Sequence, residues 1–303
     1  MLKKTLLALL LSSAASAFAL PLSSQHALVF EEDSGTVLFE KNAHDVVPIA
    51  SLTKLMTAMV VLDSKPDMNE MITIDESDVD TLKNSSSRVP VGAILPRQAV
   101  LELALMSSDN RAAHALARSY PGGMPAFVSA VREKLTTLGM HQTTIEEPTG
   151  LSPHNRSTAA DLLKMATAAS TYPEIGRLTT GTEDLIDMNG RSVHYHNTNR
   201  LVGSDGWDIL LSKTGFTQEA GRCLVMRFQS AGKHVVLVLL NAKASAARMM
   251  DAVNIQRYVN GEPVYAAKAT THRVAHKGRS GKSGIMLIKT KGSIKKHRKN
   301  RTV

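Results

Sequence analysis

The chain has 303 residues, of which 43% are hydrophobic and 21% charged, so it can bury a core and is not a wholly disordered protein. One cysteine excludes a disulfide framework and a CxxC metal or redox site, and 4% aromatic residues argue against a stacking platform for nucleic acid, so no nucleic-acid partner is expected. The net charge of +9 is uneven: residues 262–303 hold 12 Lys or Arg and one acid, a net +11, which leaves −2 for residues 1–261.

The first 19 residues have the order of a secretory signal peptide. Two lysines precede the apolar run Leu6–Leu11, and small residues follow up to Ala19. A short membrane anchor is the alternative, but the apolar run is well short of the roughly 20 residues that a span needs. We therefore expect cleavage after Ala19 and an exported, soluble, periplasmic protein.

Strand signals lie near both ends of the chain, and helix signals lie between them. Two strand-like segments flank the turn Asp33–Gly35 and predict a hairpin of Ala27–Glu31 and Val37–Lys41. Apolar spacing predicts helices at Ser51–Ser64, Gln98–Met106, Arg111–Ser119, Ala126–Leu138 and Ala159–Ser170. The stretch Thr179–Asn199 is expected to be loop-rich. Strands are predicted again, followed by a last helix, at Ile209–Lys213, Arg222–Phe228, Val235–Leu240 and Ala244–Val259.

This order predicts an α/β fold whose sheet is built from both ends of the chain, with a helical lobe inserted between them. We expect residues 20–261 to form the folded body, with the sheet part at about 20–65 and 200–261 and the lobe at about 66–199. The basic tail, residues 262–303, is expected to be disordered. Its charge also suits contact with anionic envelope polymers or lipid head groups.

Three short motifs occur in the order Ser51-x-x-Lys54, Ser108-Asp109-Asn110 and Lys213-Thr214-Gly215. The S-x-x-K pattern occurs three times, at Ser51, Ser230 and Ser293, so it carries little weight alone. Only its first occurrence opens an apolar helix. The S-x-N motif falls at a break between helices, and the rarer K-T-G motif is expected at the end of a strand. Their joint order and settings favour a catalytic centre.

The chemistry that these residues offer is nucleophilic catalysis. Ser51 and Lys54 lie one helical turn apart, so both side chains point the same way. A serine hydroxyl needs a base to remove its proton, and a lysine becomes that base only where burial or nearby positive charge, such as Lys213, disfavours its ammonium form. The backbone N–H groups of Ser51 and Phe216 are expected to stabilise a developing oxyanion.

The other motif residues have complementary roles. Ser108 is expected to pass a proton to the leaving nitrogen, and Asn110 to hydrogen-bond Lys54 and a substrate amide. Lys213 and Thr214 are expected to hold a carboxylate, and Gly215 to let a substrate backbone approach closely. Taken singly, each motif has a plainer explanation as a helix cap, a solvated lysine, or a strand end with a turn.

Other candidate functional residues have weaker support in the sequence. His194 and His196 alternate in the chain, but no H-E-x-x-H motif or cysteine ligand set accompanies them, so a metal site is not favoured. Cys223 lies in an apolar run and is expected to be a buried small residue rather than a nucleophile.

The motifs resemble those of the low-molecular-mass penicillin-binding proteins, which are serine D-alanyl-D-alanine peptidases, and are most similar to the endopeptidase branch of penicillin-binding protein 7 type. The resemblance covers about residues 25–260. It rests on the stretches Pro48–Leu62, Leu103–Ala113, Glu147–Ser152 and Leu211–Leu224.

The resemblance implies an antiparallel sheet flanked by helices, as in β-lactamases and DD-peptidases. It implies an acyl-enzyme on Ser51, peptidoglycan stem peptides and cross-links as substrates, β-lactams as covalent inhibitors, and no metal or organic cofactor. Arg222 is expected to help hold a carboxylate, and Ser85–Arg88 to form a loop at the rim of the cleft.

Three alternatives stay open at this point. A D-Ala-D-Ala carboxypeptidase shares the same acylation step, although such enzymes usually append a second domain and an anchoring helix. A β-lactamase would need a glutamate such as Glu147 to activate water, but Thr149–Ser152 after it follows the peptidase pattern. A non-catalytic envelope-binding protein would not need every motif residue.

Overall fold

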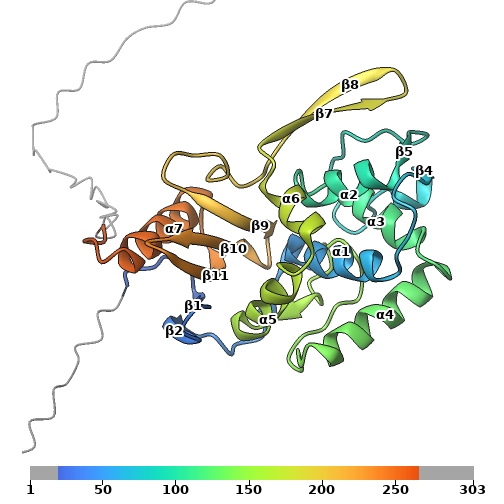
Figure 1. Ribbon diagram of the computed structural model, residues 1–303. Helices are drawn as coiled ribbons and strands as arrows, with labels where there is room; N and C mark the ends of the chain where they lie inside the picture. Colours follow the sequence, from blue (N-terminus) through green and yellow to red (C-terminus); the bar gives the residue numbers. More distant parts are fainter. Residues whose placement is uncertain (1–19, 266–303) are drawn as a thin grey trace, which may run out of the picture. The chain divides into compact units, whose positions relative to one another are not determined.

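The computed structural model describes residues 20–265, and the expected signal peptide and nearly all of the basic tail lie outside these residues. The described chain is organised around a five-stranded antiparallel sheet (Figure 1). Its strands, in spatial order, are β2 (Thr36–Lys41), β1 (His26–Glu31), β11 (Lys233–Ala242), β10 (Gly221–Ser230) and β9 (Asp208–Thr217).

The two ends of the described chain meet in this sheet. Strand β1 pairs with β11 from His26 opposite Leu240 to Glu31 opposite Val235. The chain leaves the sheet after β2, forms six α-helices and returns to the sheet at β9, so the prediction of an α/β fold with an inserted helical lobe is confirmed. The hairpin predicted at Asp33–Gly35 is also observed, and the predicted strands Arg222–Phe228 and Val235–Leu240 pair as a second hairpin.

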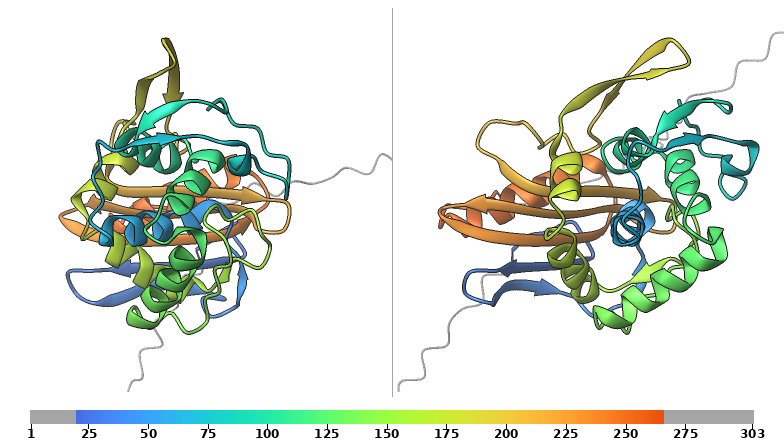
Figure 2. Two further views of the ribbon diagram at one scale, coloured as in Figure 1. Left: turned by 90° about the vertical axis from the view of Figure 1, so that its right-hand side faces the viewer. Right: turned by 45° about the vertical axis from the view of Figure 1, so that its right-hand side comes forward.

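Side-chain alternation along the sheet divides the apolar residues into two cores. In β11, Val236, Val238 and Leu240 face one core, and the residues between them face the other. Helix α7 (Ser245–Val259) covers the second core, while the remaining helices lie on the first face (Figure 2). The sheet is therefore buried on both sides.

Six α-helices lie between β2 and β9, and all but the last begin within three residues of a predicted start. They are α1 (Thr53–Asp63), α2 (Arg97–Leu105), α3 (Asn110–Arg118), α4 (Gly123–Thr137), α5 (Ala159–Ala169) and α6 (Pro173–Thr180). Short strands and 3₁₀ turns connect them: β3 (Val47–Pro48), η1 (Ala50–Leu52), β4 (Met71–Thr73), η2 (Glu76–Asp78), β5 (Ile94–Pro96) and β6 (Arg156–Ser157). Side chains cap two of the helices, since Asp109 accepts from Ala112 N–H and Thr158 accepts from Asp161 N–H.

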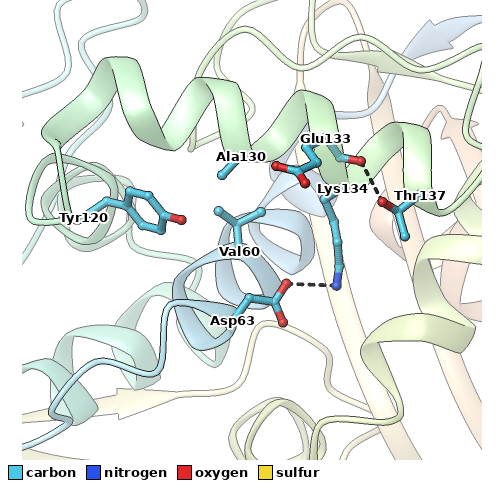
Figure 3. A pocket seen from close by; sticks show the side chains of 7 residues that line it. All are labelled: Val60, Asp63, Tyr120, Ala130, Glu133, Lys134 and Thr137. Carbon is cyan, nitrogen blue, oxygen red and sulfur yellow. Dashed lines mark hydrogen bonds and ion pairs between the residues drawn. The ribbon is translucent and has the colours of Figure 1, made fainter.

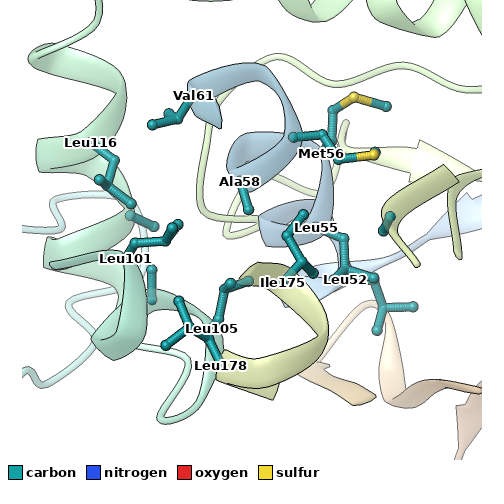
Figure 4. Packing of buried hydrophobic residues seen from close by; sticks show 14 of the residues in the cluster. Leu52, Leu55, Met56, Ala58, Val61, Leu101, Leu105, Leu116, Ile175 and Leu178 are labelled. Atoms are coloured by element: carbon teal, nitrogen blue, oxygen red, sulfur yellow. The ribbon is translucent and has the colours of Figure 1, made fainter. Parts of the chain in front are cut away.

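Helix α1 is the centre of the first core. Its residues from Thr53 to Val61 are all buried, as its nearly unbroken apolar sequence predicts. Figure 4 shows Leu55 and Ala58 of α1 surrounded by side chains of α2, α3 and α6. Truncating such a leucine to alanine costs about 2–5 kcal/mol, so packing on every side fixes the position of this helix.

The expectation of a loop-rich stretch at Thr179–Asn199 is wrong. Helix α6 runs to Thr180, and β7 (Glu183–Met188) pairs with β8 (Arg191–His196) in a hairpin that projects from the body (Figure 1). Its turn is Asn189-Gly190, and both residues have positive φ. This dipeptide is a strong hairpin signal, and Pro173 at the first position of α6 is a helix signal. Both signals were present in the sequence.

The K-T-G motif does not end a strand. Strand β9 continues to Thr217, and the register runs on from Lys213 opposite Val225 to Thr217 opposite Gly221. Glycine disfavours strands by itself, which is why the sequence suggested an end here. Pairing with β10 overrides that preference, so the motif lies inside a regular strand.

Candidate active site

Ser51 lies where the chain enters α1. Ala50 has a left-handed backbone (φ +48°), and Ser51 follows within η1, one turn before Lys54. Neither Ile49 nor Leu52, the N-cap residues of η1 and α1, makes a side-chain cap hydrogen bond. The Ser51 hydroxyl instead lies 3.0 Å from Lys54 Nζ. The plain reading of Ser51 as a capping serine therefore does not describe its contacts.

Lys54 is only 1% exposed and contacts three oxygen atoms. Besides Ser51 Oγ, its Nζ donates to Asn110 Oδ1 and to the Thr149 carbonyl, both at 2.7 Å. Burial lowers the pKa of Lys54 from 10.5 to about 8, and the charge of Glu147 opposes that shift. The amine is thus brought close to the range in which it can accept a proton.

The three contacts of Lys54 also orient its amine. The Asn110 Oδ1 and Thr149 carbonyl oxygens only accept hydrogen bonds, so each needs an N–H from Nζ. A neutral amine has two N–H groups and one lone pair. With both N–H groups engaged, the lone pair faces the Ser51 hydroxyl, which can then donate to it. This geometry suits removal of the Ser51 proton.

Thr149 was not predicted as a site residue, and a glycine fixes its position. Gly150 has φ +85°, and a Cβ atom there would lie 1.9 Å from the Ala50 carbonyl oxygen. The carboxylate of Glu147 accepts from Thr149 N–H and Gly150 N–H, both at 2.7 Å. The segment is therefore held tightly against the start of η1, which places the Thr149 carbonyl against Lys54.

Ser108 and Asn110 reach the site from the break between α2 and α3, as predicted. Ser108 has a left-handed backbone (φ +61°), and its Oγ accepts from Lys213 Nζ at 2.8 Å. Asn110 bridges two parts of the site, because its Nδ2 donates to Ser85 Oγ at 2.8 Å while its Oδ1 accepts from Lys54. The second motif thereby connects the first to the third.

Lys213 is the second buried amine of the site, also 1% exposed. Burial lowers its pKa well below 10.5, and the positive charges of Lys54 and Arg248 lower it further. Its neighbour Thr214 bonds to Thr198, Oγ1 to Oγ1, at 2.7 Å. A Cβ on Gly215 would lie 3.1 Å from Ser51 N, so glycine permits β9 to approach the serine closely.

These residues surround a cleft of about 300 Å³. Of the eight predicted site residues, Lys54 and Lys213 lie behind its wall and the other six line it. The full lining is Ser51, Ser108, Asn110, Thr198, Thr214, Gly215, Phe216, Arg222, Ser245 and Arg248. Thr198, Ser245 and Arg248 were not predicted, because no local pattern connects them to the motifs.

Basic and aromatic side chains are part of the lining of the cleft. The Arg222 guanidinium lies 3.5 Å from the centroid of the Phe216 ring. Arg248 is buried, and its Nη1 donates to the Cys223 carbonyl at 3.0 Å. Burial raises the pKa of the Cys223 thiol to about 11, which agrees with its predicted role as a buried small residue.

The rim loop Ser85–Arg88 lies beside the cleft. Ser87 Oγ donates to Asp109 Oδ2 at 2.7 Å, and Arg88 Nη1 donates to the His194 carbonyl at 2.7 Å. Just before this loop, Lys83 forms an ion pair with Glu219 in the turn between β9 and β10. The helical lobe and the sheet are thus linked across the rim.

A separate hollow of about 280 Å³ lies between α1 and α4 (Figure 3). Lys134 Nζ there lies 2.9 Å from Asp63 Oδ2, and none of the predicted site residues lines it. Within residues 20–265, none of the helices has the length and apolar character needed to cross a bilayer.

Comparison with known proteins agrees with the geometry. The chain matches the family described as D-alanyl-D-alanine carboxypeptidase over residues 13–244. It is 45% identical over 250 residues to a D-alanyl-D-alanine endopeptidase of Pseudomonas aeruginosa, covering 82% of this chain and 81% of the relative. It is 42% identical over 240 residues to a D-alanyl-D-alanine endopeptidase of Escherichia coli, covering 78% of this chain and 77% of the relative.

Solved structures of related enzymes have the same fold. The Streptomyces K15 DD-transpeptidase superimposes with a TM-score of 0.74 at 27% identity, covering 79% of this chain and 98% of that one. The cefotaxime-bound form of penicillin-binding protein D2 from Listeria monocytogenes superimposes with a TM-score of 0.65 at 30% identity, covering 77% and 95%.

Proposed function

Because the chain belongs to the D-alanyl-D-alanine carboxypeptidase family, we propose that it is a serine-type D-alanyl-D-alanine endopeptidase that hydrolyses peptidoglycan cross-links. The observation that carries the proposal is the contact of the buried Lys54 amine with Ser51, Asn110 and Thr149. The sequence identity of this chain to the D-alanyl-D-alanine endopeptidases of P. aeruginosa and E. coli supports the endopeptidase reaction.

In the proposed acylation step, Ser51 Oγ attacks the carbonyl carbon of a D-alanyl residue. The Ser51 proton moves to the neutral Lys54 amine, and the new C–O bond places negative charge on the carbonyl oxygen. The backbone N–H groups of Ser51 and Phe216 stabilise this oxyanion. The close approach of Gly215 to Ser51 N supports that pairing, because it brings the two segments together.

Breakdown of the tetrahedral intermediate then releases the amine of the neighbouring stem peptide. Ser108 Oγ–H donates a proton to the leaving nitrogen and recovers one from Lys213 Nζ, with which it shares a 2.8 Å hydrogen bond. The proton that Lys54 took from Ser51 then replaces the one lost by Lys213, so Lys54 is neutral again before hydrolysis. The C–N bond breaks and leaves an ester on Ser51. Water, deprotonated by Lys54, hydrolyses this ester and restores the serine.

Binding of the substrate is assigned to the third motif and to residues beside it. Lys213 and Thr214 hold a carboxylate of the peptide, and Asn110 bonds a substrate amide. Arg222 and the buried Arg248 line the same cleft and add positive charge. These assignments would also explain inhibition by β-lactams, which carry a carboxylate next to a reactive amide. The cefotaxime-bound state of the Listeria relative supports this inference.

The glutamate of the site argues against the β-lactamase alternative. The Glu147 carboxylate accepts hydrogen bonds from the N–H groups of Thr149 and Gly150 and from Asn155 Nδ2. The Glu147 carboxylate therefore stabilises its own loop rather than orienting a water molecule beside Ser51. We expect a stoichiometric adduct with a chromogenic cephalosporin, whereas rapid turnover would contradict the proposal.

The carboxypeptidase alternative is tested with two substrates. Purified protein is incubated separately with cross-linked muropeptides and with a stem pentapeptide ending in D-Ala-D-Ala. The products are identified by mass spectrometry. We expect cleaved cross-links with wild type and no product with Ser51→Ala, which also tests the non-catalytic alternative. Trimming of the pentapeptide alone would favour a carboxypeptidase.

The place of action is proposed to be the periplasm. The order of charges and apolar residues in 1–19 supports export, and the substrate lies in the cell envelope. We assign to the basic tail, with its net +11 in residues 262–303, contact with anionic envelope polymers. Loss of salt-sensitive binding to peptidoglycan sacculi on truncation after residue 265 would support that assignment, and unchanged binding would contradict it.

A further inference from the structure

The exposed face of the β7–β8 hairpin carries two histidines and a glutamate. Side chains alternate along these strands, so Ile186, Met188 and Tyr195 are buried and anchor the hairpin. Glu183, His194 and His196 lie on the opposite face and are exposed. Anchoring by the buried face holds this donor face in a defined arrangement.

The three donor groups lie close enough together to share one metal ion. Glu183 lies directly opposite His196 in the strand register. One carboxylate oxygen, Glu183 Oε2, is 3.2 Å from His194 Nε2 and 3.1 Å from His196 Nδ1, and the two rings are 4.3 Å apart. In a tetrahedral zinc site, bonds of about 2.0–2.1 Å place neighbouring ligand atoms about 3.3 Å apart. Two of the three ligand separations are therefore close to the required value.

We propose that Glu183, His194 and His196 form a binding site for a divalent transition-metal ion of the Zn²⁺, Cu²⁺ and Ni²⁺ type. Imidazole suits these ions, whereas Mg²⁺ and Ca²⁺ prefer sites made of oxygen ligands alone. Three protein ligands leave a further coordination position for water or another ligand. The histidine pair alone did not favour a metal site, because Glu183 joins it only when the hairpin forms.

The site lies next to the rim of the proposed active-site cleft. The carbonyl of His194 accepts a hydrogen bond from Arg88, and the Arg88 guanidinium lies 4.0 Å from the centroid of the Tyr195 ring. The metal ligands and the rim loop Ser85–Arg88 are therefore joined through one side chain. The plainer explanation of the cluster is an ion pair between Glu183 and protonated histidines.

Calorimetric titration with Zn²⁺ distinguishes these explanations. The full chain, without an affinity tag, is first treated with EDTA. One sample is then titrated with ZnCl₂ and a second, separate sample with MgCl₂. We expect wild type to bind Zn²⁺ but not Mg²⁺. His194→Ala and His196→Ala should each weaken Zn²⁺ binding about tenfold or more, and the double variant should lose one equivalent of zinc. Glu183→Gln should weaken binding because it removes the charged ligand.

The chain offers a matched control. His272 and His276, outside the described residues, are four residues apart, and replacing both with alanine should leave the hairpin site intact. Labelling of every variant with a fluorescent penicillin checks that the protein is folded, independently of zinc. No zinc binding by wild type, or unchanged affinity and stoichiometry in the His194→Ala/His196→Ala variant, would overturn the proposal.

Discussion

The buried centre around Lys54 and the exposed rim that carries Lys83 place the same side chain in opposite surroundings. Among residues 20–265, no carboxylate contacts the Lys54 amine, which bonds to two carbonyl-type oxygens and a hydroxyl. Lys83 is partly exposed and forms an ion pair with Glu219. Burial therefore favours a neutral amine at Lys54, whereas the Lys83 amine keeps its contact with water and with a carboxylate.

The comparison shows that chemistry at this site comes from the environment and not from the residue type. The packing of α1 on all sides removes water from Lys54, and Thr149 and Asn110 supply oxygens that orient its amine. The rim has neither the packing nor the acceptors. If this account is right, changes at the centre should have large effects on acylation, and changes at the rim small effects on stability.

Lys54→Arg should have the largest effect. Arginine keeps the positive charge but does not release its proton at neutral pH, so it is not a base. We expect acylation by a fluorescent penicillin to slow about 10³-fold, or about 4 kcal/mol in activation free energy. Lys164→Arg is the matched control, because Lys164 is exposed on α5 and paired with Asp161. Near-normal acylation by Lys54→Arg would show that Lys54 is not the base.

Gly150→Ala tests the packing that places the Thr149 carbonyl. The new Cβ would overlap the Ala50 carbonyl oxygen, and φ +85° is strained for alanine. We expect the free energy of unfolding in urea to fall by on the order of 4 kcal/mol. Gly92→Ala is the control, since Gly92 has φ +82° with no atom within 4 Å of the new Cβ. It should cost about 1 kcal/mol. Equal losses would mean that contact with Ala50 is unimportant.

The pH dependence of acylation tests the lowered pKa of Lys54. Only the neutral amine accepts the Ser51 proton, so the rate should rise with pH, reach half its plateau near pH 8 and level off above it. At pH 6 the rate should be about a hundredfold below the plateau, because the neutral fraction falls tenfold per pH unit. Rates of penicillin labelling between pH 6 and 9.5 measure this, and a flat profile would contradict the assignment.

Lys83→Ala should have the smallest effect. Solvent and salt screen an exposed ion pair, so loss of the contact with Glu219 should leave the urea midpoint close to that of wild type. Glu219→Gln should behave in the same way. A large loss of stability in either variant would mean that the rim is held far more strongly than its exposure indicates.

Much of the fold followed from local patterns in the sequence. The continuous apolar run Val235–Leu240, which follows a turn, predicted the central strand. The apolar run after Ser51 predicted the buried helix, because both signals lie within a few neighbouring residues. The β7–β8 hairpin was missed although Asn189-Gly190 signalled it. The extension of β9 past Gly215 depends on its pairing with β10, which no local pattern contains.

The sequence by itself determined that a serine and a lysine lie three residues apart where an apolar helix begins, since their spacing and their neighbours are local facts. It also supplied the other two motifs in order. Only the tertiary structure decided that the Thr149 carbonyl, Thr198 and Arg248 join them, and that Glu183 meets His194 and His196. These contacts bring together residues from separate elements, and such distances are set by packing and strand register, not by sequence spacing.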